Sequence, residues 1–204
     1  MLFLAALVGA LICVAAGTCG VLLAMAILPR LQRFEDGPAP QKVHPAALVA
    51  GAGVLGAVLA WHHVPPIEFL IAALTTIALV AVWYCDARTG IVPDVFTLVP
   101  LGLCVAYGLF NHEWLVPISA VVLFVPFGVA ALLSHGRGMG WGDAKLAAFG
   151  GALLGMFVAT LAFGVASLVA VIVSSIRYRA KPVPIAFAPY LVAAIAVSLA
   201  IQVR

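Results

Sequence analysis

The stretch Asp86-Ala-Arg-Thr-Gly-Ile-Val-Pro-Asp94 is a short polar interruption between two long apolar runs. A second interruption of the same kind is Gly138-Met-Gly-Trp-Gly-Asp-Ala-Lys-Leu146. Together the two stretches hold three of the seven acidic residues of the chain, namely Asp86, Asp94 and Asp143. An acidic side chain at the edge of hydrocarbon is costly to place, so each of these positions is a functional hypothesis.

The composition of the chain places it in a membrane. Of its 204 residues, 66% are hydrophobic and 8% are charged, and the mean hydropathy is +1.25. So few polar groups cannot cover a water-exposed surface, and the long uncharged runs must face lipid. No stretch between the runs is long enough to bury a separate aqueous core. We therefore expect a polytopic protein in the lipid bilayer, and the net charge of +3 indicates no nucleic-acid partner.

The apolar runs predict an all-α transmembrane bundle of about eight spans, since roughly 20 apolar residues cross the hydrocarbon core. A short helix is expected directly after Asp143, with a bend at Gly150, Gly151 or Gly155. The first run has no basic segment before it, so we expect it to remain as a span. The predicted spans are 2–28, 46–61, 66–85, 95–111, 114–134, 143–155, 157–176 and 185–203.

The basic residues predict how the bundle is oriented. Nine of the ten Lys and Arg residues fall in or beside the odd-numbered connections, and the tenth is Arg204. By the positive-inside rule these connections are cytoplasmic, both termini are outside, and the three acids lie near the cytoplasmic face. The nine residues are Arg30, Arg33, Lys42, Arg88, Arg137, Lys145, Arg177, Arg179 and Lys181.

Structural roles could also explain some of these residues. Asp94 and Asp143 each stand at the start of an apolar run, where a carboxylate can cap a helix by accepting backbone N–H groups. The Gly-x-Gly before Asp143 can be no more than a tight turn. Asp86 is harder to explain in this way, because it stands at the end of a predicted helix, where the macrodipole disfavours an anion.

Taken together, the motifs resemble those of the type IV prepilin peptidases, which are Gly-x-Gly-Asp membrane aspartic proteases. The resemblance lies in Asp86, in Pro93-Asp94 seven residues further on, and in Gly140-x-Gly-Asp143-x-Lys-Leu some fifty residues later. A third stretch, Pro184-Ile-Ala-Phe-Ala-Pro-Tyr190, is similar to a Pro-Phe-Gly-Pro-Tyr segment of that family, with Ala188 in place of Gly. The resemblance extends from about Trp83 to Val203.

This resemblance implies that Asp86 and Asp143 are the catalytic pair. Two carboxyls that share a site of low dielectric hold one proton between them, so one can activate water while the other polarises the scissile carbonyl. No metal or organic cofactor is implied. Asp94, Gly140, Gly142 and Lys145 would have supporting roles, although Lys145 could equally be a lysine that extends to the membrane surface.

The first connection departs from the larger members of that family, which carry paired Cys-x-x-Cys motifs there and methylate the new N-terminus. Here this connection covers only 29–45 and has no cysteine. We expect residues 1–65 to form an N-terminal pair of spans without a methyltransferase segment, and 66–204 to form the peptidase core. The cysteines, Cys13, Cys19, Cys85 and Cys104, lie within apolar spans and are interpreted as small hydrophobic side chains.

The predicted activity is removal of the leader from a type IV prepilin or pseudopilin precursor, at the cytoplasmic face of a bacterial inner membrane. A presenilin-like intramembrane protease shares the Gly-x-Gly-Asp motif, but it has a Tyr where Cys85 precedes the first acid here. A small proton-coupled transporter is the alternative from another class. It would require an internal repeat around a midplane site, and the sequence shows no convincing repeat. The oligomeric state is not predicted.

Overall fold

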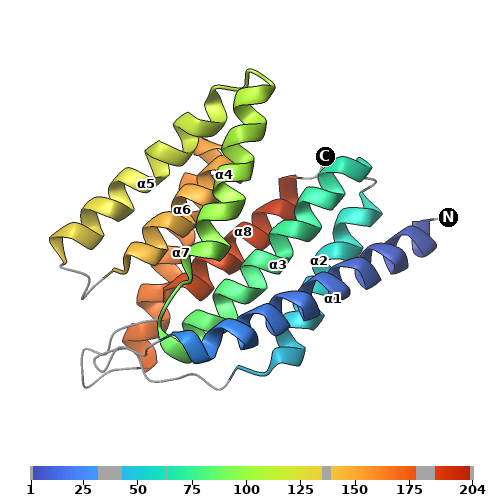
Figure 1. Ribbon diagram of the computed structural model, residues 1–204, viewed down its shortest axis with the longest axis horizontal. Helices are drawn as coiled ribbons and strands as arrows, with labels where there is room; N and C mark the ends of the chain where they lie inside the picture. Colours follow the sequence, from blue (N-terminus) through green and yellow to red (C-terminus); the bar gives the residue numbers. More distant parts are fainter. Residues whose placement is uncertain (1, 32–42, 63, 135–138, 178–186, 203–204) are drawn as a thin grey trace.

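The computed structural model describes residues 2–31, 43–62, 64–134, 139–177 and 187–202, and these form an all-α bundle (Figure 1). A short 3₁₀ helix, η1 (Leu28–Arg30), follows the first α-helix. The eight α-helices of the described residues are α1 (Leu2–Ile27), α2 (Pro45–Trp61), α3 (Pro66–Thr89), α4 (Asp94–Phe110), α5 (Leu115–Leu133), α6 (Trp141–Leu154), α7 (Met156–Arg177) and α8 (Ala188–Gln202).

Each predicted span corresponds to one helix, and most boundaries agree within two residues. Four helical segments are long and apolar enough to cross a membrane, namely Leu2–Arg30, Pro66–Thr89, Leu115–Leu133 and Met156–Ile176. The apolar helices α2, α4 and α8 are shorter, with 17, 17 and 15 residues. These four helices identify the protein as an integral membrane protein. The number of eight spans stays a prediction.

The end predicted for the third span is wrong by four residues, because α3 continues to Thr89. The helix ends where Gly90 adopts a left-handed conformation (φ 69°) and donates its N–H to the carbonyl of Asp86 at 2.8 Å. Thr89 also donates its hydroxyl to the carbonyl of Cys85. Because Gly90 ends the helix, Asp86 lies inside the last turn of α3 and not beyond it.

The short helix expected near Asp143 is present as α6, which begins two residues earlier, at Trp141. The bend expected among three glycines occurs at Gly155, whose φ of 79° separates α6 from α7. Gly150 and Gly151 are helical instead, and both are buried. Ten of the 14 residues of α6 are buried, which makes this helix the centre of its half of the bundle.

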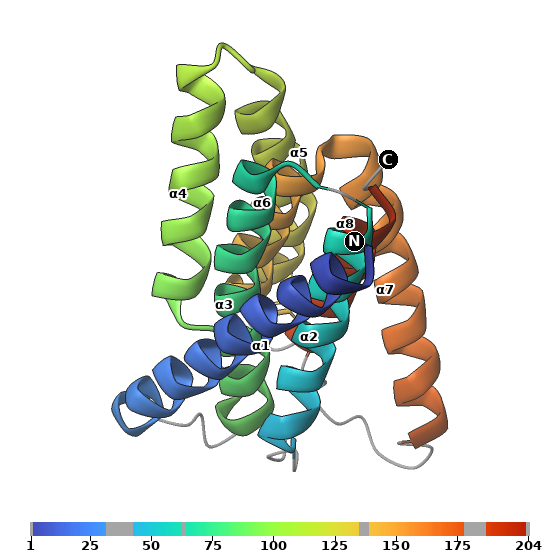
Figure 2. The same ribbon diagram turned by 90° about the vertical axis from the view of Figure 1, so that its right-hand side faces the viewer.

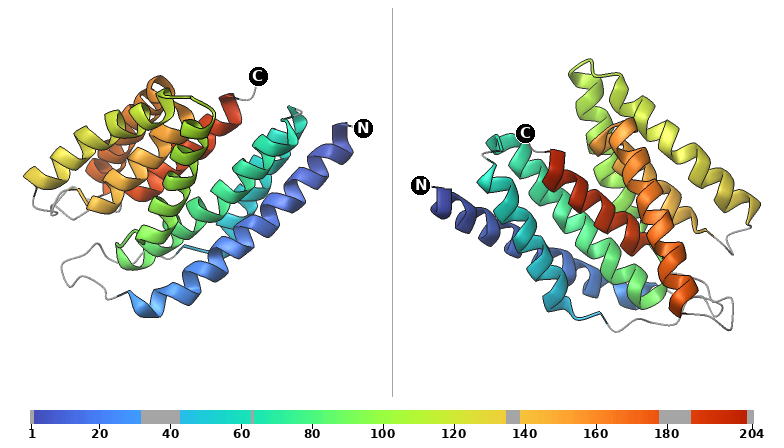
Figure 3. Two further views of the ribbon diagram at one scale, coloured as in Figure 1. Left: turned by 45° about the horizontal axis from the view of Figure 1, so that its top comes forward. Right: turned by 180° about the vertical axis from the view of Figure 1, so that it is seen from behind.

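The helices pack as two groups, and α3 joins them through its contacts with α8 and α4. In the first group, α1 packs along α2 and α3. In the second, α6 contacts α4, α5, α7 and α8 (Figures 2 and 3). Large apolar side chains on α4, α5 and α7 are exposed, as expected for helices that face lipid.

The helix ends that precede the odd-numbered connections lie on one side of the bundle, as the distribution of basic residues predicts. The ends of α1, α3, α5 and α7 lie toward one side of the bundle, and both chain termini lie toward the other (Figure 1). The odd-numbered connections therefore share a side. Asp86 at the end of α3 and Asp143 at the start of α6 both lie toward it.

Candidate active site

Asp86 is a buried acid without a hydrogen-bond donor. The residue is 5% exposed, and its Oδ2 atom has no hydrogen-bond partner among the described residues. A buried polar atom left in this state costs about 1–3 kcal/mol. The carbonyl groups at a helix end also disfavour a negative charge there. A carboxyl that served only the fold would not be expected in this position, so the unpartnered oxygen marks a functional candidate.

Asp143 is also buried, at 8% exposed, but its carboxyl group has a donor. Its Oδ2 atom accepts the N–H of Gly140 at 3.2 Å, and its own N–H donates to the Gly140 carbonyl at 3.1 Å. The capping role considered from the sequence is present in part: Gly140 is the N-cap residue of α6, and Asp143, at the third helical position, accepts its N–H. It uses one carboxylate oxygen and holds the side chain in a defined orientation at the start of α6.

Two contacts join the start of α6 to the connection between α3 and α4. A Cβ atom added to Gly142 would lie 2.6 Å from Cβ of Val92, so only glycine allows this approach. Three residues later, Nζ of Lys145 lies 2.6 Å from Oδ1 of Asp94. These contacts bring the first turn of α6 against the residues that follow α3.

The result is that the two buried acids, 57 positions apart in the sequence, lie at the same end of the bundle, one at the end of α3 and the other at the start of α6. Their carboxyl groups are near enough to interact electrostatically. Two carboxylates repel each other in a site of low dielectric, and a shared proton lowers the energy of the site. This is the arrangement that lets one acid accept a proton while the other donates one.

Asp94 and Lys145 form an ion pair, which revises two interpretations of the sequence. Asp94 does not act as the helix cap, because Pro93 holds that position and the carboxylate of Asp94 binds Lys145. Lys145 is directed to that carboxylate and is only 27% exposed. A partly exposed pair contributes at most about 1 kcal/mol to stability, so its position matters more than its energy.

Some residues singled out from the sequence fall elsewhere. Arg88 stacks over the ring of Tyr84, with 5.4 Å between its guanidinium carbon and the ring centroid. His62 lies at the far end of α3 from the acids. Gly138, His135, Arg137 and the segment 184–186 lie outside the described residues.

The sequence reasoning missed the role of Val92, which supplies the surface on which Gly142 rests. A valine between Ile91 and Pro93 carries no signal of its own. The pairing of Asp94 with Lys145 was also missed, since opposite charges 51 positions apart do not predict a contact.

Comparison with known proteins shows which family the chain belongs to. Residues 73–175 match the type IV leader peptidase family, a match that covers half of the chain and includes both Asp86 and Asp143. The chain belongs to the type IV leader peptidase family. The match ends before the third stretch, 184–190.

One relative of this leader peptidase family is a prepilin leader peptidase/N-methyltransferase of Stutzerimonas stutzeri. It is 30% identical over 150 residues, which cover 68% of this chain and 52% of the relative. The chain therefore spans about half the length of the relative that it matches. No solved structure matches the chain.

The two glycines of the motif should respond differently to an added methyl group. Gly142→Ala forces its Cβ against Val92 and should destabilise the folded protein by about 1–3 kcal/mol. Gly140→Ala is the matched control, because its Cβ would lie 3.5 Å from the nearest atom, an ordinary contact. Thermal unfolding in detergent checks this. Equal melting temperatures for the two variants would contradict the close approach of Gly142 to Val92.

Proposed function

We propose that this protein is a membrane aspartic endopeptidase that removes the leader from type IV prepilin or pseudopilin precursors. The main support is that two buried acids from the ends of different helices, Asp86 and Asp143, lie in the same part of the bundle. Membership of the type IV leader peptidase family supports the same reaction class. The peptidase core would comprise 66–204, which holds every residue assigned to the site.

The surroundings of the two acids suggest which one carries the shared proton. Asp143 accepts a backbone N–H, and such a bond favours the ionised carboxylate. Asp86 has an oxygen without a donor, in a position where an anion is disfavoured. We assign the negative charge to Asp143 and the proton to Asp86.

The reaction then proceeds without a covalent intermediate. Asp143 takes a proton from a bound water, and the water oxygen attacks the carbonyl carbon of the scissile peptide bond. Asp86 donates its proton to the carbonyl oxygen, which forms a neutral tetrahedral intermediate. When the C–N bond breaks, the proton held by Asp143 passes to the leaving nitrogen, and Asp86 recovers its own proton. The reaction requires no cofactor.

Asp94, Lys145, Gly140 and Gly142 serve this chemistry as positioning residues. The ion pair and the close approach of Gly142 hold α6 against the α3–α4 connection, and Gly140 orients the carboxylate of Asp143. A displacement of about 1 Å at a reacting group can reduce a rate about a hundredfold, so loss of these contacts lowers activity without removing an acid.

The proposed location of the site is the cytoplasmic face of a bacterial inner membrane. The basic residues of the odd-numbered connections support this orientation, because positive charge accumulates on the cytoplasmic side. A precursor with a charged leader in the cytoplasm and an apolar helix in the bilayer would place its scissile bond at the level of the two acids.

The acid pair is tested by replacement with the neutral isostere. Asp86→Asn and Asp143→Asn should each abolish cleavage of a co-expressed prepilin, because neither amide can exchange the proton, while expression and membrane insertion stay normal. The measurement is the mobility shift of the prepilin on a gel. Leu98→Asn, on the exposed face of α4, is a control that should cleave normally. Near-normal processing by either Asp variant would show that the assigned pair is wrong.

The orientation is tested by thiol labelling in a variant free of the native cysteines. A cysteine in place of Arg88, which is exposed at the end of α3, should react with an impermeant reagent only after the cytoplasmic side is opened. A cysteine in place of Asn111, exposed between α4 and α5, should react in intact cells. Labelling of the Arg88 position from outside would reverse the proposed topology.

We also propose that this chain does not methylate the product. Methyl transfer from a donor such as S-adenosylmethionine needs a pocket of several hundred Å³ lined by polar groups, and the connection 29–45 is short and lacks cysteine. Purified protein should release the leader from a prepilin but transfer no label from methyl-labelled S-adenosylmethionine. Stoichiometric labelling of the mature N-terminus by this protein alone would contradict the assignment.

A further inference from the structure

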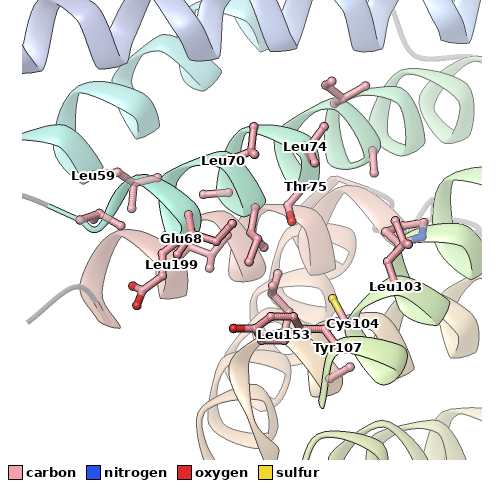
Figure 4. A pocket seen from close by; sticks show the side chains of 18 of the residues that line it. Leu59, Glu68, Leu70, Leu74, Thr75, Leu103, Cys104, Tyr107, Leu153 and Leu199 are labelled. Atoms are coloured by element: carbon pink, nitrogen blue, oxygen red, sulfur yellow. The ribbon is translucent and has the colours of Figure 1, made fainter. Parts of the chain in front are cut away.

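A long apolar groove lies between α3 and α4 on the side of the two acids that faces the bilayer interior. Both Figure 1 and Figure 3 show these helices diverging from their short connection. The groove has a volume of about 930 Å³, and side chains from α1, α2, α5, α6 and α8 complete its walls. Figure 4 shows Leu59, Leu153 and Leu199 among them. None of the residues proposed for the chemistry lines it.

The groove leads toward the acid pair. Its near end is formed by Ala78 of α3 and by Val95 and Phe96 of α4, which directly follow Asp94. Ala78 precedes Asp86 by eight residues, a rise of about 12 Å along the helix. A chain that leaves the acid pair toward the bilayer therefore enters the groove.

The far end of the groove matches the depth of a membrane. Glu68 and Glu113 line that end. Glu68 precedes Asp86 by 18 residues, a rise of about 27 Å, which is close to the thickness of the hydrocarbon core. A helix of about 18 apolar residues would span the whole distance, and the two carboxylates would favour a basic residue at its end.

One polar group points into the middle of the groove. Thr75 is buried, yet its hydroxyl makes no hydrogen bond with any described residue, whereas Thr76, beside it, donates to the carbonyl of Ala72. Figure 4 shows the hydroxyl of Thr75 directed into the groove. A membrane-embedded hydroxyl without a partner is unfavourable in lipid, and this one is free to donate to a backbone carbonyl of a bound apolar helix.

We infer that this groove binds the apolar helix that directly follows the scissile bond of the protein substrate. The inference rests on the proposed peptidase function, since it places the substrate relative to the acid pair. The groove would hold the substrate helix alongside α3 and α4, with the cut at Asp86 and Asp143 and the basic end near Glu68 and Glu113. Recognition would then depend on the apolar helix and not on the leader alone.

Two leucines of α4 provide a matched test. Leu103 lines the groove and is 64% exposed, whereas Leu98 is 44% exposed on the same helix and does not line it. Leu103→Trp should lower kcat/KM for a membrane-embedded prepilin about tenfold, through a higher KM. Leu98→Trp should stay within about twofold of the unchanged protein. Both substitutions add the same bulk to an exposed position of one helix, so a difference reports on the groove.

Crosslinking identifies the occupant directly. A photo-crosslinking residue is placed at Leu103 or at Leu98 in the inactive Asp86→Asn variant, in membranes that contain the prepilin. The Leu103 position should form an adduct with the apolar segment of the prepilin, and the Leu98 position should not. Adducts with lipid alone at Leu103, together with equal kinetics for the two Trp variants, would overturn the inference. Failure of the unchanged protein to cleave the prepilin would instead overturn the proposed function.

Discussion

The site depends on the contact between the first turn of α6 and the connection that follows α3. Gly142 rests on Val92 there, and Lys145 binds Asp94. The ion pair is partly exposed and contributes little energy by itself, whereas Gly142 is required because any side chain at that position would collide with Val92. Together they fix the start of α6 against the α3–α4 connection, and so they bring Asp86 and Asp143 to one buried region.

Much of the fold could be predicted from the sequence because lipid imposes one rule on every apolar run. A backbone in hydrocarbon must satisfy its own hydrogen bonds, so each run becomes a helix. The error at the end of α3 came from treating Asp86 as a helix end, whereas Gly90 and its left-handed conformation supply the actual stop. The two acids were found because an acid beside lipid is conspicuous. The contacts that bring the two acids together could not be found from the sequence. Val92 is one apolar residue among many, and the position of Lys145 in the sequence does not indicate which acid it pairs with.

Chemistry and substrate recognition would take place in different parts of the bundle, the first at the helix ends and the second along the middle of the helices. The polar ends of α3, α4 and α6 would supply the chemistry, and the diverging faces of α3 and α4 would supply recognition of an apolar helix. This division explains why an open groove is retained in a bundle whose α6 is otherwise closely packed. It also explains why a buried Thr75 is left without a partner. A peptidase that recognises the apolar helix after the scissile bond would accept leaders of different sequence.

The central question for this protein is whether Asp86 and Asp143 share one site in the membrane, and crosslinking tests it most directly. In a variant without native cysteines, Asp86→Cys and Asp143→Cys are combined and treated with a short bifunctional thiol reagent in intact membranes. If the two acids share a site, an intramolecular crosslink should form. None should form when Asp86→Cys is combined with Glu113→Cys, at the other end of the bundle. Absence of the first crosslink, with both thiols shown to react with a monofunctional reagent, would contradict a shared site.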